Sequence, residues 1–290
     1  MGFQNSLKKH RTKRIEAFSL RHQCRGYNAR IKDFDSTKEI VLLDGITHYT
    51  ATRIHALRKR AQRVSDGVRF SNALDGWFYR GDEPMKLLRL FTELRLKDGY
   101  ILHGCRYVTH GNGNGLVCAT REENCNSDLL PIMNGELAPL PISIEAFESI
   151  DGTLSDFMEA IEGDGSPWSY FSASILAREL QEYGALWHGA SWSTCTILDV
   201  APWELTASKV DASHMDSPSP RESWTWTQDE PVDWRPRVEF IHGRPRVTFY
   251  AYSALGGERI SKFIDTYPPD AYTFESEEIE IADGSVGYVF

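Results

Sequence analysis

The stretch that decides the fold runs from Arg237 to Tyr252 and reads RVEFIHGRPRVTFYAY. Arg237–Ile241 and Arg246–Tyr252 are rich in the β-branched and aromatic residues that favour strands. Between them lies His242-Gly243-Arg244-Pro245, where glycine tolerates a positive φ angle and proline interrupts a strand. The pattern predicts an antiparallel β-hairpin in the second half of the chain.

Further strands are expected on both sides of this hairpin. Tyr100–Thr109 and Leu116–Thr120 flank His110-Gly111-Asn112-Gly113-Asn114-Gly115, whose glycines we interpret as the turn of another hairpin. Glu278–Ala282 is expected to pair with Ser285–Phe290 across Asp283-Gly284. Residues 40–43 are expected to form either a short buried strand or the edge of a helix, and a strand is expected at residues 194–200.

Several segments have helical spacing instead. His48–Val64 predicts an amphipathic basic helix, and Met85–Leu96 predicts a helix that is apolar on most of its circumference. Ser166-Pro167 places a capping serine and a proline at the start of a third helix, which Gly184 ends. Shorter helices are expected from the capping pattern Thr153-Leu154-Ser155-Asp156 and in Glu258–Asp265.

These blocks predict an α+β fold in which antiparallel β-hairpins combine with several packed helices, because the strands lack βαβ spacing. We expect a basic, mostly helical N-terminal region at residues 1–65. Residues 66–290 would form an acidic α+β body with a long loop at 206–236 that is rich in Trp, Pro and Ser.

The charge of the chain is unevenly distributed. The net charge is −9, yet residues 1–100 hold 21 Lys and Arg against 11 Asp and Glu. Such asymmetry indicates a basic surface for nucleic acid, for anionic lipid or for an acidic partner. The alternatives are that the two halves attract each other within one molecule, or that both are solvated faces.

We therefore predict a non-catalytic recognition or accessory protein that uses a basic N-terminal helical surface. Trp224 and Trp226 add a surface for a second protein partner, because tryptophan is enriched at interfaces. The alternative is that both rings pack into the core. The predicted binding residues are Lys8, Lys9, Arg11, Lys13, Arg14, Arg53, Arg58, Lys59, Arg60, Arg63, Trp224 and Trp226.

The competing hypothesis is an intracellular enzyme, hydrolase-like or metal-dependent. One candidate site holds His188, Ser191 and Cys195, where a nucleophile and a base lie close in sequence without the G-x-S-x-G pattern. The other is a group of metal-ligating residues without a C-x2-C pair, so we assign no metal and no cofactor. That group consists of His103, Cys105, His110, Cys118 and Cys125.

Composition excludes several other classes. The chain of 290 residues has 41% hydrophobic residues and no apolar run of about 18 residues, so a transmembrane segment is not expected. Its five cysteines are too few and too dispersed for a secreted disulfide scaffold. Because the N-terminus also lacks an apolar leader, we expect a cytoplasmic protein.

Overall fold

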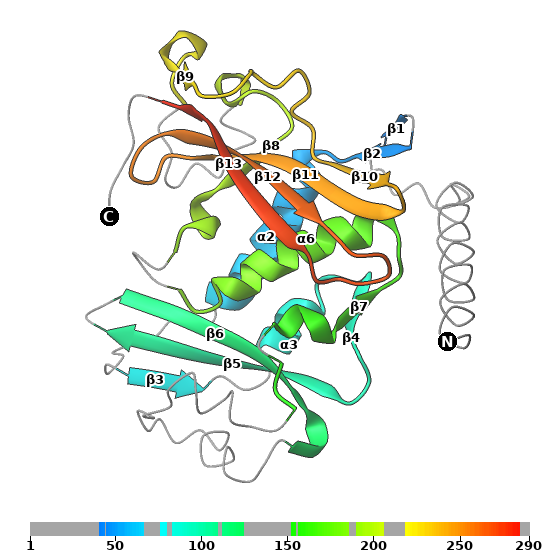
Figure 1. Ribbon diagram of the computed structural model, residues 1–290. Coiled ribbons are helices and arrows are strands. Elements are labelled where there is room, and N and C mark those ends of the chain that lie inside the picture. The colour runs from blue at the N-terminus through cyan, green and yellow to red at the C-terminus, as the bar shows by residue number, and fades with distance from the viewer. Residues whose placement is uncertain are drawn as a thin grey trace, which may run out of the picture.

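The computed structural model describes residues 41–43, 45–66, 76–79, 83–109, 112–124, 152–154, 156–185, 190–205 and 218–284. Its largest element is an eight-stranded antiparallel sheet in the order β1-β2-β10-β11-β12-β13-β9, with β8 also paired to β11 (Figure 1). A three-stranded sheet, β3-β5-β6, lies at the opposite end of the molecule, and β4 pairs with β7. Helices fill the space between the two larger sheets.

The strands are β1 (Val41–Leu43), β2 (Ile46–His48), β3 (Gly76–Tyr79), β4 (Leu94–Leu96), β5 (Tyr100–Thr109), β6 (Asn112–Arg121), β7 (Ile161–Gly163), β8 (Thr196–Leu198), β9 (Thr225–Trp226), β10 (Arg237–Ile241), β11 (Arg244–Ser253), β12 (Arg259–Thr266) and β13 (Glu275–Asp283). The α-helices in these ranges are α2 (Ala51–Asp66), α3 (Glu83–Leu88) and α6 (Pro167–Gln181). Short 3-10 helices include η2 (Phe157–Ala160), η4 (Trp192–Thr194) and η6 (Arg221–Ser223).

The hairpin predicted from the opening stretch is confirmed as β10 and β11. Ile241 pairs with Arg244, so the turn consists of His242 and Gly243, with φ angles of 51° and 78°. Two successive positive φ angles are typical of the tight turns whose twist matches that of the strands. Inward side chains such as Val238 and Phe249 then build the core of the large sheet.

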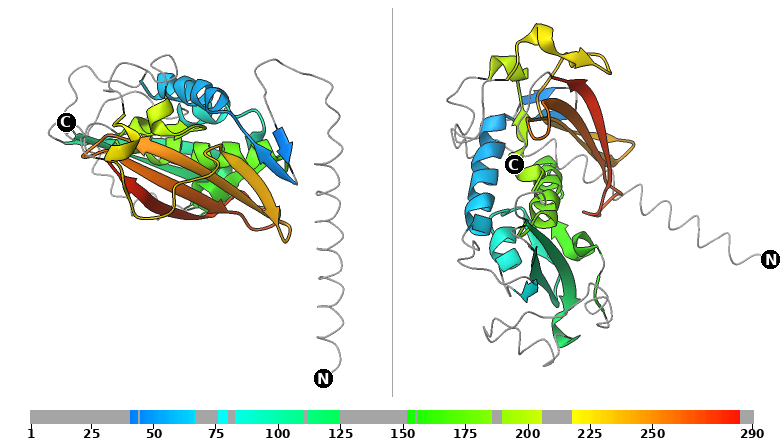
Figure 2. Two further views of the ribbon diagram at one scale, coloured as in Figure 1. Left: turned by 90° about the horizontal axis from the view of Figure 1, so that it is seen from above. Right: turned by 90° about the vertical axis from the view of Figure 1, so that its left-hand side faces the viewer.

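Helix α6 lies at the centre of the core, and its start at Ser166 and Pro167 confirms the helix predicted from these capping residues. Ser166 caps it by accepting a hydrogen bond from the Ser169 amide, and Pro167 occupies the first turn. Every residue from Trp168 to Leu180 is buried, because the large sheet covers one side and the small sheet approaches the other (Figure 2). Helix α2 runs beside α6 and contributes Ile54, Leu57 and Ala61 to the same core.

Two glycines allow the β5–β6 hairpin to approach the end of α6. A Cβ atom at Gly104 would lie 2.5 Å from the Tyr183 ring, and one at Gly115 would overlap the Tyr183 carbonyl. The hairpin prediction is confirmed, but Gly113 and Gly115 lie within strand β6 rather than in the turn. At Gly115 the requirement is therefore close backbone approach, which any side chain would prevent.

The predicted fold class is wrong because it overestimates the helices relative to the sheet. The described chain is dominated by antiparallel sheet and contains three α-helices, rather than hairpins with several packed helices. The Glu258–Asp265 helix is instead strand β12, and Met85–Leu96 splits into short α3 and strand β4. After Asp156, which caps η2, the chain turns into strand β7, so no long helix forms there.

The proposed boundary near residue 65 falls between segments that share one core. Strand β2 pairs with β10, which lies almost 190 residues further along the chain. Residues 1–40 and the Ser285–Phe290 partner of the last predicted hairpin lie outside the described residues. Much of the 206–236 loop is described from residue 218 onward, where it contains η6 and β9.

Candidate functional site

The predicted basic surface begins with helix α2, whose cations divide between two directions. Its exposed residues are Thr52, Ala56, Lys59, Arg60 and Arg63, which recur at helical spacing on one face. Figure 2 shows this helix on the outside of the molecule. The buried face carries Ile54, Leu57 and Ala61, and it also carries Arg58. Arg58 is therefore directed away from the surface that Lys59, Arg60 and Arg63 share.

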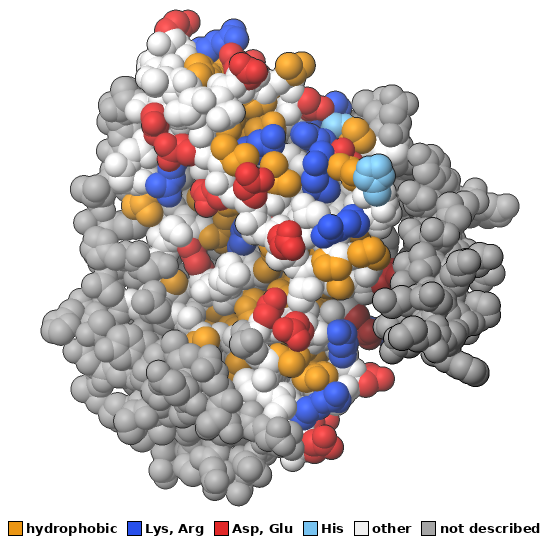
Figure 3. Space-filling view, in the orientation of Figure 1, with side chains coloured by type: hydrophobic (Ala, Val, Ile, Leu, Met, Phe, Trp, Pro, Cys, Tyr) orange, Lys and Arg blue, Asp and Glu red, His pale blue; other side chains and the backbone are white. Residues whose placement is uncertain are grey.

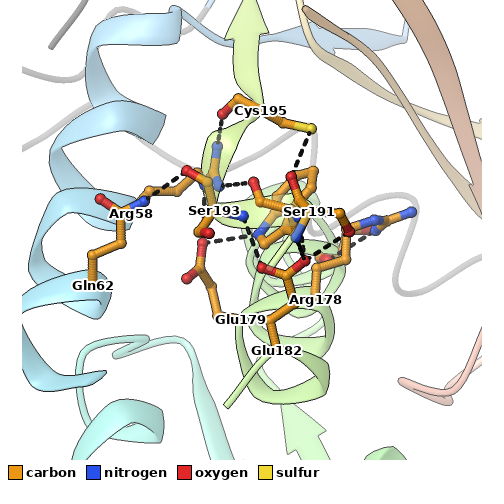
Figure 4. A network of polar contacts seen from close by, with 10 residues as sticks. Arg58, Gln62, Arg178, Glu179, Glu182, Ser191, Ser193 and Cys195 are labelled. Carbon is orange, nitrogen blue, oxygen red and sulfur yellow. Dashed lines mark hydrogen bonds and ion pairs between the residues drawn. The ribbon is translucent and has the colours of Figure 1, made fainter. Parts of the chain in front are cut away.

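Arg58 enters a buried network between α2 and α6 (Figure 4). Its Nε donates to Glu179 Oε1 at 2.9 Å, and its two terminal nitrogens donate to the carbonyls of Cys195 and Trp192 at 2.5 and 2.7 Å. The guanidinium also lies 4.2 Å from the centre of the Trp192 ring. The side chains of Arg58 and Glu179 are both about 95% buried, so Arg58 is not available to bind a partner at the surface.

Arg53 has a different environment at the start of α2. Its guanidinium lies 3.5 Å from the centre of the Trp168 ring, a cation–π contact with an aromatic residue of α6. Partial burial lowers its pKa, and its Nη1 is buried without a hydrogen-bond partner. Of the five α2 cations predicted to bind a partner, Lys59, Arg60 and Arg63 are thus the exposed set.

The loop after α6 is held by Glu182. Its carboxylate accepts hydrogen bonds from the backbone amides of Ser191, Trp192 and Ser193, and from the Ser191 hydroxyl at 2.8 Å. These contacts close the N-terminal end of η4 and satisfy amides that would otherwise lack partners. The Ser191 hydroxyl is therefore directed to a capping carboxylate, while His188 lies outside the described residues.

Cys195 is also held by this loop. Its thiol donates to the Ser191 carbonyl at 3.4 Å, and burial raises its pKa. A raised pKa keeps the thiol protonated near neutral pH, and the thiolate is the nucleophilic form. The described members of the hydrolase-like site therefore perform packing and capping roles.

The predicted metal-ligating group is only partly described. His103 lies opposite Cys118 in the β5–β6 register, and both side chains are buried. His103 Nε2 lies 2.8 Å from Thr120 Oγ1, and burial lowers the pKa of His103 to about 4. No group of three or more His, Cys, Asp or Glu suited to a metal occurs among the described residues, which exclude His110, Cys125 and the Cys105 side chain.

The two predicted tryptophans lie in a second, smaller core on the other face of the large sheet. Trp224 is 6% exposed, and its indole nitrogen donates to the Ser219 carbonyl. Trp226 is half-buried and packs at 6.3 Å from Trp203, measured between ring centres. The alternative in which the rings pack internally therefore describes Trp224, while part of Trp226 reaches the surface.

Sequence reasoning missed the acidic partners in α6 and the sheet. Arg178 donates to both carboxylate oxygens of Asp265, at 2.7 and 2.8 Å, in the interior. The segment Leu176-Ala177-Arg178-Glu179-Leu180 places two charges inside an otherwise buried helix, and this was an available signal for internal ion pairs. Their partners lie 87 and 121 residues away and cannot be read from local spacing.

No known protein family, curated protein or solved structure matches this chain. Among the described residues, no helix combines the length and the apolar character needed to cross a bilayer. Lys8, Lys9, Arg11, Lys13 and Arg14 lie outside the described residues. The candidate site that the structure describes is therefore the outer face of α2.

Proposed function

We propose that this protein is a non-catalytic recognition protein whose α2 outer face binds an acidic segment of a partner protein. The observation that carries the proposal is the convergence of Lys59, Arg60 and Arg63 on one exposed helical face. The sequence of α2 holds one acidic residue, Asp66 at its last position, so the helix carries an excess of positive charge. We further propose a cytoplasmic location, which the Cys195 side chain supports because it forms no disulfide.

The geometry favours an acidic protein segment over nucleic acid. Lys59 and Arg63 are four residues apart, which corresponds to a rise of about 6 Å along the helix. This short basic ridge suits a few carboxylates, whereas nucleic-acid binding proteins often contact 6–10 phosphates. The surrounding chain is acidic, with 30 Asp and Glu against 11 Lys and Arg after residue 100, and would repel a long polyanion.

The rigid attachment of α2 supports this role. Arg58 fixes the helix to α6 and to the η4 loop, and the Asp199 carboxylate accepts a hydrogen bond from the Ala51 amide at its first turn. A helix held at both positions presents its outer face without a backbone ordering cost on binding, so that only the side chains must be ordered. The buried contacts of Arg58 thus fix the helix face on which Lys59, Arg60 and Arg63 lie.

The test is binding of a fluorescently labelled poly-glutamate peptide to the full chain, measured by anisotropy. Replacing Lys59, Arg60 and Arg63 together by glutamine should weaken binding about tenfold or more, because three charge-assisted contacts are removed. The control is a matched triple replacement of Arg95, Arg221 and Arg244, which are exposed on other elements and remove the same charge. This control should change the affinity less than threefold.

A labelled DNA duplex of similar charge is measured in parallel. Duplex binding that is tighter than peptide binding, and that is lost in the α2 variant, would replace the acidic partner by nucleic acid. Equal losses in the two triple variants would overturn the proposal, because binding would then follow net charge and not the α2 face.

A further inference from the structure

A depression of about 430 Å³ lies on the outer face of the large sheet, on the side opposite α2 and α6. It is bounded by β2, β10 and β11 and by the loop at residues 231–236. Figure 3 shows this face, where Lys, Arg and His side chains gather among hydrophobic ones toward the β10 side of the sheet. The depression thus combines charged and apolar walls.

The charges around it leave a single positive excess. Arg235 binds both carboxylate oxygens of Asp233, at 2.9 and 2.8 Å, and this contact lowers the pKa of Asp233 to about 2. The pair is therefore neutral as a unit. Arg237 also lines the depression, and it forms no ion pair or side-chain hydrogen bond with any residue that the structure describes.

His48 provides an independent indication of a ligand. It is 6% exposed, it lines the depression, and its Nδ1 is buried without a hydrogen bond. The nearest carboxylate oxygen, on Asp233, is 3.6 Å away, which is too long for a hydrogen bond. A buried nitrogen without a partner is costly, and such groups occur often at functional sites.

The remaining walls are apolar. Tyr250 and Ile46 line the depression from the sheet, and Val232 lines it from the loop. Val232 is fully exposed and is the one large hydrophobic side chain in that state among the described residues. These groups would contact an apolar part of a ligand next to its charged end.

We propose that this depression binds a small molecule in which a carboxylate is attached to an apolar group. The Arg237 guanidinium would hold the carboxylate by two parallel hydrogen bonds, a geometry that guanidinium and carboxylate share. One unpaired cation matches one negative charge, whereas a dianionic phosphate would leave a charge without compensation. Val232 and Ile46 would then cover the apolar group.

The same site should couple ligand binding to proton uptake. Burial, Arg235 and Arg237 lower the pKa of His48, while Asp233 opposes this effect, so His48 is neutral at pH 7. A bound carboxylate adds a negative charge beside Arg237 and raises the pKa of His48. Protonated His48 would be attracted to the bound carboxylate and to the nearby Asp233 carboxylate, so affinity should increase as the pH falls below 7.

The experiment uses the full chain and isothermal titration with hexanoate, acetate, phenyl phosphate and an Ala-Ala-Val peptide with a free or amidated C-terminus. We expect hexanoate to bind at least tenfold more tightly than acetate, because acetate lacks the apolar group. Binding of the free peptide but not the amidated peptide would identify a peptide C-terminus as the source of the same carboxylate. Absence of binding by every carboxylate, or tighter binding of phenyl phosphate, would overturn the proposal.

Variants locate the site. Arg237→Gln should weaken hexanoate binding about tenfold or more, whereas Lys262→Gln, on the same face but outside the depression, should change it less than twofold. Val232→Ser should reduce the preference for hexanoate over acetate while acetate binding stays the same. Equal effects of Arg237→Gln and Lys262→Gln would show that only the overall charge of the face attracts the ligand, and would refute the assignment.

Discussion

The buried ion pair between Arg58 and Glu179 provides the sharpest test of how α2 is held against α6. Arg58→Met keeps an apolar side chain of similar length but leaves the Glu179 carboxylate in the interior. That carboxylate would retain only the Trp192 indole, which donates to it at 3.0 Å. The carbonyls of Trp192 and Cys195 would also lose their donor. Removing one partner of such a pair should destabilise the fold by about 3–5 kcal/mol.

A second variant separates the unpaired charge from the lost hydrogen bonds. Arg58→Met combined with Glu179→Leu removes both charges and leaves two carbonyls and one indole N–H without partners. The double variant should therefore be destabilised by at least about 2 kcal/mol less than the sum of the single variants, because the two residues are directly coupled. This difference is the interaction free energy of the pair.

The assay is urea unfolding, followed by tryptophan fluorescence and by far-UV circular dichroism, with coincident transitions as the criterion for two-state behaviour. The control is Arg95→Met, which breaks the pair between Arg95 and Glu162, where the side chains are 79% and 36% exposed. A pair this exposed contributes less than about 1 kcal/mol. A loss below 1 kcal/mol for Arg58→Met, or strict additivity in the double variant, would refute the reasoning.

Two further predictions concern the hairpin β5–β6. Gly115→Ala should lower the free energy of unfolding by about 1–3 kcal/mol, because the new Cβ atom meets the Tyr183 carbonyl. The control is Gly256→Asn, at a position with positive φ in open space, which should change the free energy of unfolding little. Equal shifts of the melting temperature in the two variants would contradict the packing argument. His103 has a pKa of about 4 in the folded state against an ordinary value of 6.5, so the unfolded chain binds the proton first as the pH falls. Stability should therefore decrease between about pH 6.5 and pH 4, by up to roughly 3 kcal/mol, and urea midpoints of His103→Asn should lack this dependence.

The parts of the fold that the sequence predicted correctly depend on local signals. The β10–β11 turn requires two positive φ angles, and Gly243 supplies one of them. The start of α6 follows from Ser166 and Pro167, because an N-cap hydroxyl and a proline in the first turn stabilise a helix through neighbouring residues alone. Such features require no knowledge of the distant chain.

Some helix predictions were wrong because a short apolar run is compatible with both the helical period and the strand period. In Arg259–Thr266 the apolar residues Ile260, Phe263 and Ile264 lie at i, i+3 and i+4, which is helical spacing. The structure instead shows the alternation of a strand over the second half of β12, where Phe263 and Asp265 are buried while Lys262 and Ile264 are half-exposed. What decides the outcome is pairing with β11 and β13 on both sides, since neighbouring strands supply the hydrogen bonds. That information is not local, so single-sequence reasoning overestimated the helical content.

In the candidate site, too, local features were predictable from the sequence whereas long-range contacts were not. Arg58 lies four residues after Ile54 and three before Ala61, so helical periodicity alone places it on the buried face, and this signal was present in the sequence. Its partner Glu179 was not predictable, because the pairing depends on how α2 lies against α6. The network at Glu182 was likewise hidden, since a carboxylate that caps a loop nine to eleven residues later has no characteristic spacing.

The internal use of Arg58 limits what the α2 surface can do. A duplex bound by three cations should show an affinity whose logarithm falls with the logarithm of salt concentration at a slope of about −3, because each neutralised phosphate releases nearly one counterion. A measured slope near −8 would require cations beyond Lys59, Arg60 and Arg63, and the first forty residues contain ten Lys and Arg. A short acidic peptide contacts few charges, so its affinity should depend only weakly on salt concentration. If the partner is an acidic protein segment, we expect this weak dependence together with a loss of affinity when Lys59, Arg60 and Arg63 are replaced. The slope therefore separates recognition by the described helix face from a broader electrostatic attraction of the N-terminal chain.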